Sequence, residues 1–250
     1  MIQIKTQAEI ELMRESGQIL AIVLNKVIDA VQPGITTKEL AVIADNEVRR
    51  LGAEPAFLGY SGFPDVICIS INDQVVHGIP GGQVIKKGDI VSLDFGVKFK
   101  GMVTDSARSI LVNSTDTIRQ KLIDGTQKSL NAGIAVVKSG KHIGDIGAAV
   151  QAVLESYGLG VVRDLVGHGV GRLVHEDPDV PNYGNSGTGP ELSSGMTIAI
   201  EPMSTLGSYE VYTAADGWSV VTKDGSLSAH FEDTILVTEA GSEILTRLKL

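Results

Sequence analysis

The sequence contains a faint internal repeat, and this repeat restricts the folds that the chain can adopt. Residues 31–40 and 137–146 share a valine, a glycine, an acidic residue and an aliphatic residue at the same spacing, 106 positions apart. Residues 88–94 and 195–201 share a glycine followed six positions later by a carboxylate, 107 positions apart. Because both matches occur in one order, duplication of a unit with two helices and a strand explains them better than chance. The repeat therefore predicts two related halves.

Hydrophobic periodicity predicts the elements of each half. Apolar residues at helical spacing indicate helices over residues 6–31, 36–51, 116–138 and 143–157. Alternating and β-branched runs indicate strands over residues 66–71, 74–79, 90–97 and 102–112, and further strands toward the C-terminus. Thr36 and Glu39 have the spacing of a capping box at the start of the second helix. Since no linker or low-complexity stretch divides the chain, we expect residues 1–250 to form one catalytic domain with one active site between its halves.

Composition excludes several classes of protein. The net charge is −9 and the pI is about 5.0, which argues against a protein that grips the phosphate backbone of DNA. The densest apolar run, Ile19–Leu24, is far shorter than the roughly 20 residues of a membrane span, and no signal peptide is visible. A single cysteine, Cys68, precludes an intrachain disulfide and fits a reducing compartment. We therefore expect a cytoplasmic globular protein that binds neither DNA nor membranes.

Asp94 and Asp105 lie on either side of a tight turn in a predicted hairpin. Their nearly symmetric positions about Phe99-Lys100-Gly101 would place them roughly opposite each other, with Cβ atoms about 5 Å apart. Two carboxylates at this distance repel each other unless a cation lies between them or one of them keeps its proton. A different register, which turns one aspartate to solvent, is the alternative.

Glu201 and Glu232 each interrupt an apolar strand. Ile198 and Ile200 fall on the strand face opposite Glu201, whose own face carries only small residues. Glu232 likewise lies on the face opposite Phe231. An acidic side chain within an apolar strand is seldom buried without a partner. These strands therefore predict a common partner for their carboxylates.

Glycines surround His168 in Gly167-His168-Gly169-Val170-Gly171, so that other groups can approach its imidazole ring closely. A nucleotide-binding loop is poorly supported, because no helix follows these glycines. His175-Glu176 lacks the second histidine of a zinc-protease helix, no Gly-x-Ser-x-Gly motif occurs, and Cys68 has no evident activating partner. His168 therefore fits a metal ligand or a proton donor, although a lone histidine is otherwise more often a core or surface residue.

The residues Asp94, Asp105, His168, Glu201 and Glu232 follow one another at spacings of 11, 63, 33 and 31 positions. With Gly-His-Gly-Val-Gly at 167–171, His-Glu-Asp-Pro at 175–178 and Ile-Glu-Pro at 200–202, this order resembles the type I methionine aminopeptidases of peptidase family M24 over essentially the whole chain. The resemblance implies the α+β pita-bread fold, in which helices pack outside a curved antiparallel sheet with two related halves. The short spacing between the last two residues leaves no room for the helical insertion of type II relatives.

The resemblance also implies a site for two divalent metal ions, of Co, Mn, Fe(II) or Zn. Asp94 would chelate one ion, Asp105 and Glu232 would bridge both, and His168 with Glu201 would complete the other. Four carboxylates and one imidazole form an oxygen-rich ligand set whose charge balances two divalent ions. Water activated by the ions would attack the first peptide bond. A weaker match to a monovalent-cation site of some relatives comes from Asn72 and Ser228.

Two further histidines are implied to act on the peptide. His175 would polarise the scissile carbonyl, His77 would contact the peptide bond, and Glu201 would move the proton. Without the resemblance, a structural hydrogen bond would explain His77 and an exposed loop would explain His175. His230 lies on the same strand face as Glu232 but matches no ligand of the family, so we interpret it as an accessory residue at most.

The methionine side chain is expected to bind among aromatic residues and a thiol, which suit an unbranched thioether. The resemblance assigns this pocket to Tyr60, Phe63, Cys68 and Trp218. Packing in the core is the alternative for these side chains, above all for Phe63. Three residues depart from those typical of relatives and leave the shape of the pocket open, though not the chemistry: Phe57, Val76 and Val174.

The chain is thus expected to be a monomeric cytoplasmic enzyme that removes the initiator methionine from nascent polypeptides whose second residue is small. Transient contact with the ribosome is expected from this task. Three other hypotheses stay open: a related peptidase that cuts before proline, a binding module without catalysis, and a structural protein with a chance acidic cluster. The first predicts cleavage of Xaa-Pro peptides, the second peptide binding without turnover, and the third no retained metal.

Overall fold

Helices and strands follow one another in two similar halves. The structure is a computed structural model that describes residues 2–249, and within them four α-helices and one short 3-10 turn accompany fifteen strands. The helices are α1 (Gln7–Ala30), α2 (Thr37–Arg50), α3 (Thr117–Ala135) and α4 (Ile143–Ser156), and the turn is η1 (Tyr60–Gly62). The strands are β1 (Glu54–Pro55), β2 (Cys68–Ile71), β3 (Gln74–Val76), β4 (Ile90–Phe99), β5 (Met102–Leu111), β6 (Gly160–Val161), β7 (Gly167–Gly169), β8 (Glu176–Val180), β9 (Thr197–Ile200), β10 (Met203–Thr205), β11 (Val211–Thr213), β12 (Val220–Thr222), β13 (Ser228–His230), β14 (Glu232–Val237) and β15 (Ser242–Ile244). The predicted helices are all present, and the first two predicted strands are shorter than expected.

The second helix of each half begins at a capping arrangement. In α2 the backbone N–H of Glu39 donates to Oγ1 of Thr36 over 3.2 Å, and the backbone N–H of Thr36 donates to Oε2 of Glu39 over 2.8 Å. In α4 the backbone N–H of His142 donates to Oδ2 of Asp145 over 2.8 Å. The predicted capping box is therefore confirmed, and the repeat carries a related cap at the equivalent place.

The internal repeat is visible in the backbone as well. Gly34 and Gly140 both take left-handed φ angles, 99° and 84°, which glycine adopts readily because it lacks a Cβ atom. The N–H of Gly34 donates to the carbonyl of Ile85, and the N–H of Gly140 donates to the carbonyl of Leu192, over 2.9 Å in both cases. The segments aligned by the repeat thus occupy equivalent places, which confirms the predicted pair of related halves.

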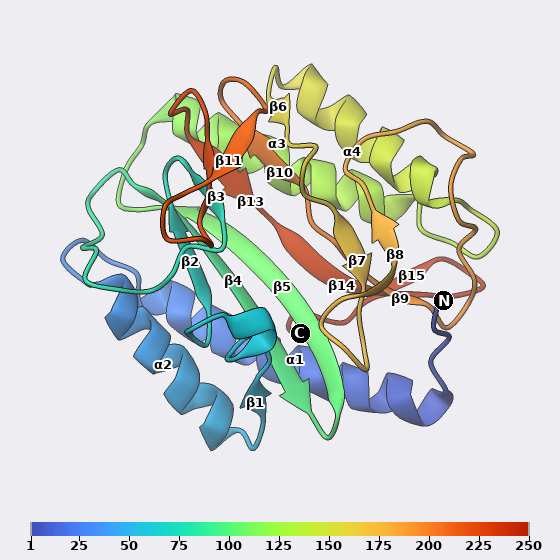
Figure 1. Ribbon diagram of the computed structural model, residues 1–250. Coiled ribbons are helices and arrows are strands. Elements are labelled where there is room, and N and C mark those ends of the chain that lie inside the picture. Colours follow the sequence, from blue (N-terminus) through green and yellow to red (C-terminus); the bar gives the residue numbers. More distant parts are fainter. Residues whose placement is uncertain (1, 250) are drawn as a thin grey trace.

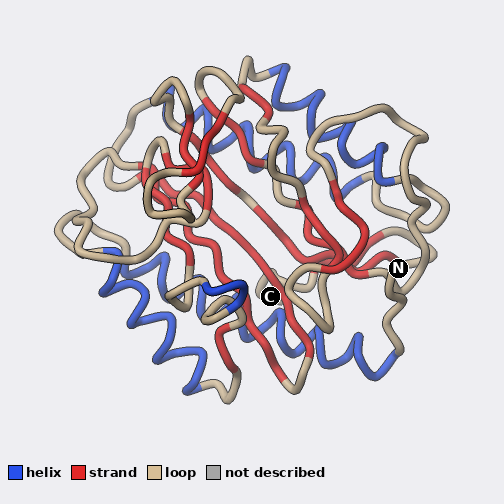
Figure 2. The backbone as a smooth tube through the Cα atoms, viewed as in Figure 1, coloured by secondary structure: helices blue, strands red, loops and turns tan. Residues whose placement is uncertain are grey.

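A nine-stranded antiparallel sheet runs through both halves. Its strands follow the order β1-β4-β5-β14-β9-β7-β8, with β2 paired to β4 and β15 paired to β14. Figure 1 shows the long central strands between the two helix pairs, α1 and α2 in blue and α3 and α4 in green and yellow. The tube in Figure 2 shows the same strands in red, flanked by the helices in blue. Because β14 pairs with β5, the two halves join in the middle of the sheet.

Strand alternation separates a helix-covered face of the sheet from the face of the candidate site. Leu93 and Phe95 of β4 belong to the apolar core that α1 and α2 share, whereas Asp94 between them points to the opposite face. Ile198 and Ile200 of β9 belong to the core that α3 and α4 share. The alternation expected from the sequence is therefore confirmed, and the architecture is the predicted α+β fold.

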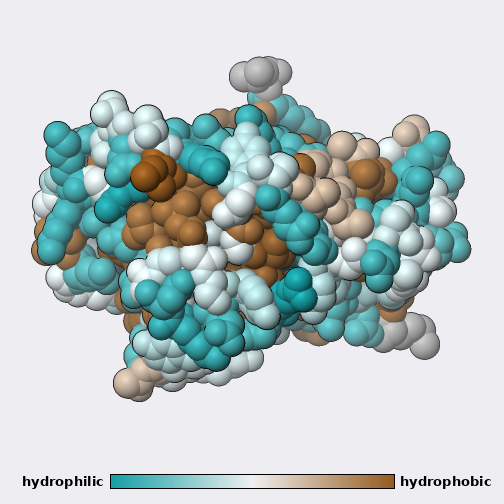
Figure 3. All heavy atoms as spheres, turned by 90° about the horizontal axis from the view of Figure 1, so that it is seen from above, coloured by the Kyte–Doolittle hydropathy of each residue, from teal (hydrophilic) through white to brown (hydrophobic). Residues whose placement is uncertain are grey.

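The surface is mainly hydrophilic, with apolar residues gathered in places. Figure 3 shows such residues in the middle of the face viewed from above, with hydrophilic residues around them. Other large apolar side chains are exposed, such as Ile118 at 63%, which is ordinary for a globular protein. None of the helices within residues 2–249 has the length and apolar character needed to cross a membrane.

Candidate metal centre

Five adjacent strands of the large sheet each bring one of the predicted ligands to the same face. In the order of the strands, Asp94 comes from β4, Asp105 from β5, Glu232 from the start of β14, Glu201 from the residue after β9, and His168 from β7. Glu232 and Asp94 are both register partners of Ala107 in β5, on its two sides. The sheet order therefore gathers residues that are scattered through more than half of the chain.

The hairpin register differs from the expected one. A two-residue turn at residues 100–101, whose φ angles are both left-handed at 47° and 88°, makes Ala107 the partner of Asp94 and Gly96 the partner of Asp105. Asp94 and Asp105 are thus diagonal neighbours and do not lie directly opposite each other. Because the difference is two residues, an even number, both carboxylates still point to the same face. The expectation of direct opposition was wrong, but so was the alternative in which one aspartate faces solvent.

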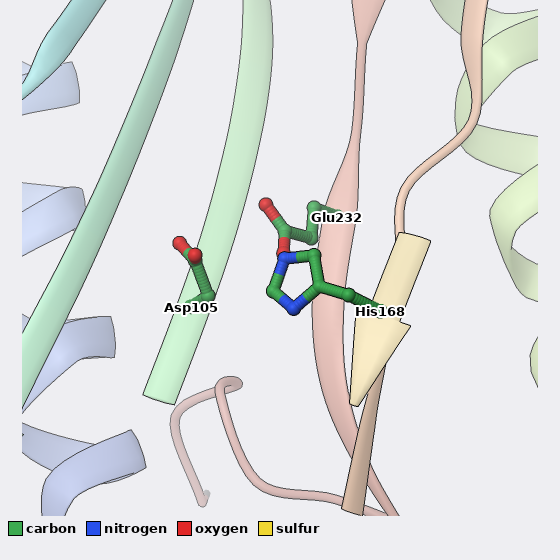
Figure 4. Close-up of side chains that lie close together, drawn as sticks. All are labelled: Asp105, His168 and Glu232. Carbon is green, nitrogen blue, oxygen red and sulfur yellow. The ribbon is translucent and has the colours of Figure 1, made fainter. Parts of the chain in front are cut away.

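Three of the side chains approach one another closely. Potential ligand atoms of Asp105, His168 and Glu232 all lie within 4.8 Å of one another, and all three residues are buried. Figure 4 shows these side chains pointing toward a common centre from three different strands. Glu201 completes the group, because its Oε1 atom lies 3.5 Å from Nε2 of His168.

The ring of His168 is oriented by its own neighbour. Its Nδ1 atom lies 2.8 Å from the carbonyl oxygen of Gly169, so the proton of the neutral ring is on Nδ1 and the lone pair is on Nε2, toward Glu201. Burial, reinforced by the nearby His175, lowers the pKa of His168 to about 3. A neutral imidazole whose second nitrogen donates to a carbonyl is the form that binds metal ions.

Burial raises the pKa of the four carboxyl groups. The pKa of Asp105 rises from 3.8 to about 7. The pKa values of the other three rise well above their usual range, because repulsion from Asp105 adds to the effect of burial in Asp94, Glu201 and Glu232. Within residues 2–249, Oδ1 of Asp94, Oδ1 of Asp105 and Oε1 of Glu232 are buried without a hydrogen-bond partner. Burying an oxygen atom without a hydrogen-bond partner costs free energy. Two divalent ions would coordinate these oxygens and would also neutralise the four carboxylates. The residues therefore fit a pair of metal ions.

His230 lies closer to this group than the sequence suggested. Its Nε2 atom is 3.6 Å from Oε2 of Glu201 and 4.0 Å from Oε2 of Glu232. The ring is buried, and neither nitrogen has a hydrogen-bond partner among the described residues. Burial, with His77 and Arg108 as smaller contributors, lowers the pKa of His230 to about 3. The strand pattern places His230 on the same face as Glu232, but no local pattern indicates how near it lies to Glu201.

A cavity of about 230 Å³ contains the ligand group and extends beyond it. All the residues predicted to bind or act on the peptide line this cavity: Tyr60, Phe63, Cys68, His77, His175 and Trp218. Of the three residues expected to shape the pocket, Phe57 and Val174 line it as well, whereas Val76 packs with Val162 and Met203 in a separate apolar cluster. Val76 is therefore not among the residues that line the cavity, although it directly precedes His77.

His77 and His175 line the cavity from two different segments: His77 directly follows β3, and His175 directly precedes β8. Nδ1 of His175 lies 2.8 Å from the hydroxyl oxygen of Tyr60, and its ring centroid is 4.1 Å from that of His168. His77 has a left-handed φ of 59°, which is unusual for a residue with a Cβ atom and typical of constrained functional sites. Its ring lies edge-on to Trp218 at 6.5 Å. Burial lowers the pKa of both histidines, so each is neutral near pH 7.

A wider groove of about 700 Å³ adjoins the cavity and shares His168 and His175 with it. The groove is lined by Leu165 and Leu173 in the loops on either side of β7 and by Asp179 of β8. A chain whose end occupies the cavity can therefore continue outward along the groove.

The fold and the buried ligand group define a metal-dependent hydrolase, and comparison with known proteins agrees with this class. Residues 11–239 match metallopeptidase family M24. A methionine aminopeptidase from Clostridium perfringens is 49% identical over 249 residues, which cover 100% of both chains. Methionine aminopeptidase 1 of Bacillus subtilis is 46% identical, over 99% of this chain and 100% of the relative. This chain therefore belongs to metallopeptidase family M24, in its methionine aminopeptidase branch.

Solved structures separate this branch from its neighbours. The crystal structure of a methionine aminopeptidase from Thermotoga maritima superposes with a TM-score of 0.98 at 45% identity, over 99% of this chain and 100% of that chain. A prolidase from Pyrococcus furiosus reaches a TM-score of 0.79 at 24% identity and is matched over 66% of its length. The likeness to prolidase concerns the fold alone.

Proposed function

We propose that the chain removes the N-terminal methionine from nascent proteins and peptides whose second residue is small. The observation that carries this proposal is the convergence of four carboxylates and one imidazole in a cavity whose buried oxygens have no other partner. The high identity to methionine aminopeptidases over the full chain supports the choice of substrate.

In this proposal two divalent ions are held by Asp94, Asp105, His168, Glu201 and Glu232. Divalent ions in such a site polarise a carbonyl oxygen and lower the pKa of water, which provides the nucleophile for hydrolysis. The oxygen-rich set suits Mn, Fe(II) or Co, and Zn less well. A monovalent cation is proposed near Asn72 and Ser228, where Oγ of Ser228 lies 2.9 Å from the carbonyl oxygen of Asn72 and 3.0 Å from that of Gln74.

The protein residues orient the peptide and move its protons. His175 donates to the carbonyl oxygen of the scissile bond from Nε2, since Tyr60 occupies its Nδ1. His77 contacts the peptide bond from the other wall of the cavity. Glu201, which lines the cavity beside His168, transfers a proton to the departing amine.

The methionine side chain binds between Tyr60, Phe63, Cys68 and Trp218. The ring centroids of Phe63 and Trp218 are 5.2 Å apart in an edge-on arrangement, which leaves apolar faces toward the cavity. Sulfur–aromatic contacts favour an unbranched thioether in such a pocket. Because the cavity is small, it accommodates the first residue and the scissile bond only when the second side chain is small, and the rest of the chain follows the groove.

In the cell, we propose a monomeric cytoplasmic enzyme whose residues 1–250 form one catalytic domain. Its partners are the methionyl ends of nascent polypeptides, with transient contact to the ribosome that presents them. The net charge of −9 disfavours binding to DNA or to acidic membrane surfaces.

A combined metal and activity measurement tests the proposal. Protein loaded with Mn or Co is analysed for metal content and then incubated with Met-Ala-Ser, Met-Leu-Ser and Ala-Pro-Ala. We expect about two ions per chain and release of methionine from Met-Ala-Ser alone. Turnover of Ala-Pro-Ala would favour a proline-directed peptidase, peptide binding without turnover would favour a binding module, and no retained metal would favour a chance acidic cluster.

A further inference from the structure

A buried ion pair lies directly behind the loop that carries His175. The Nζ atom of Lys5 is 2.6 Å from Oε2 of Glu176, the residue that follows His175. The two side chains are only 1% and 4% exposed. This pair joins residues that are 171 positions apart in the chain. His175, unlike the pair, is exposed and lines both the cavity and the groove.

The second carboxylate oxygen of Glu176 binds the backbone of the loop that precedes it, residues 171–176. Oε1 accepts a hydrogen bond from the backbone N–H of Arg172 over 2.6 Å and another from that of Leu173 over 3.0 Å. Both oxygens of one carboxylate are therefore occupied, one by Lys5 and one by the loop backbone. Residues 171–176 are bound into a compact turn whose geometry depends on where this carboxylate is held.

The N-terminal segment is itself fixed in place. The backbone N–H of Lys5 donates to the carbonyl of Gly195 over 2.9 Å. The side chain of Lys5 runs so close to Gly171 that a Cβ atom there would lie 2.2 Å from Cε of the lysine. The lysine cannot move aside easily, because its ammonium group is buried against Glu176, so only glycine fits at this position.

Solvent-exposed contacts connect the same two segments. Nε of Arg172 donates to Oε1 of Glu9 over 2.6 Å, at the first turn of α1. Exposed pairs of this kind contribute little to stability. A buried pair is also a poor source of net stability, since desolvation offsets the attraction between the charges, but it fixes geometry strictly when every polar atom is satisfied. The arrangement therefore specifies position more than it adds stability.

We propose that Lys5 and Glu176 are positioning residues that hold the loop of residues 171–176 so that His175 faces the scissile carbonyl. The inference rests on the proposed role of His175 in the function given above. It extends the catalytic machinery to a lysine that precedes the first helix and touches neither substrate nor metal. A purely structural pair would stabilise the fold without acting through His175.

The experiment compares Lys5→Met with a matched control, Lys26→Met, which breaks the pair between Lys26 and Glu47 on α1 and α2. On Met-Ala-Ser, we expect Lys5→Met to lower kcat about tenfold or more with little change in KM and with the metal content unchanged. Lys5→Arg should recover part of the loss, and Lys26→Met should retain the wild-type kcat. An unchanged kcat in Lys5→Met would overturn the proposal.

A double variant separates positioning from stability. When His175 is replaced by alanine, Lys5→Met should cause no further loss of kcat, because its effect passes through His175. Independent, multiplying losses in the double variant would overturn the proposal.

Hydrogen exchange keeps the inference distinguishable from the proposed function. The amides of Arg172 and Leu173 should exchange faster in Lys5→Met and in Glu176→Gln than in the wild type. If the wild type were inactive, the proposed function would fail, and the exchange rates would still decide whether the pair holds the loop. Unchanged exchange at both amides would overturn the positioning role.

Discussion

The Nε2 atom of His168 lies 3.5 Å from Oε1 of Glu201, although 33 positions separate the two residues in the chain. They meet because β7 and β9 are neighbours in the sheet, where Gly169 is the register partner of Ile198. The other proposed ligands are brought together in the same manner by β4, β5 and β14. The order of the strands, more than any single motif, creates the site.

Replacing Asp94 with asparagine removes one negative charge from the site while keeping the shape of the side chain. We expect one of the two metal ions to bind more than about tenfold more weakly, a loss that even outer partners of metal ligands can produce. Calorimetric titration of the metal-free variant with Mn or Co measures this affinity. Two sites of unchanged affinity would contradict the assignment of Asp94 as a ligand.

In the proposed function, His175→Ala removes a hydrogen-bond donor to the transition state and no ligand of the metal ions. We expect kcat on Met-Ala-Ser to fall by about 10²–10³, the range found for loss of one such donor. Elemental analysis of the same preparation should still give the wild-type metal content. Loss of both ions in this variant would instead assign His175 to the metal site.

Metal ions should stabilise the fold, because their ligands are assembled only in the folded chain. At a free metal concentration of 100 times Kd, one ion adds about 2.7 kcal/mol to the free energy of unfolding. Thermal unfolding with and without a chelator measures this shift, and Asp94→Asn serves as a control with a smaller one. A Tm that chelation leaves unchanged would speak against a metal site.

The metal-free protein should show a pH dependence of stability to which Asp105 contributes in the same direction as Asp94, Glu201 and Glu232, whose pKa values are also raised. The pKa of Asp105 is about 7 in the fold against an ordinary 3.8, so the folded state binds its proton more tightly than the unfolded state. The stability from this group is fully present below about pH 4 and is lost as the pH rises through about 7. His168 and His230, with pKa values of about 3, have the opposite effect and lower stability as the pH falls below 6.5.

The comparison with Asp105→Asn isolates the carboxyl group from the histidines. Urea unfolding in chelator between pH 4.5 and 8 should show the wild type losing stability relative to the variant as the pH rises. A difference in unfolding free energy that stays constant over this range would mean that Asp105 has an ordinary pKa in the fold.

The helices and the strand faces could be predicted because their signals are local. Thr36 and Glu39 are three positions apart and cap one helix, and Ile198 and Ile200 alternate with Thr197 and Ala199 within one strand. The hairpin register could not be predicted, because moving a two-residue turn by one position, from residues 99–100 to residues 100–101, changes the pairing of the strands by two residues. The two-residue shift therefore became visible only in the pairing of Asp94 with Ala107.

Contacts between distant segments have no comparable signal in one sequence. Nothing near Lys5 indicates that its ammonium group reaches Glu176, and nothing near His230 indicates its distance from Glu201. The proposed ligand set rests on the resemblance to a family, because the residue types alone do not show which carboxylates share one metal site. Side-chain packing in three dimensions decides such contacts, and local propensity does not encode it.

Each of five neighbouring strands brings one proposed ligand to the site, so the site depends on the alignment of all of them. A slip of any one strand by a single residue would turn its ligand toward the helices. Metal binding therefore reports whether all five strands are in the correct register. A chain with one misaligned strand would keep its helix content but would not retain the ions.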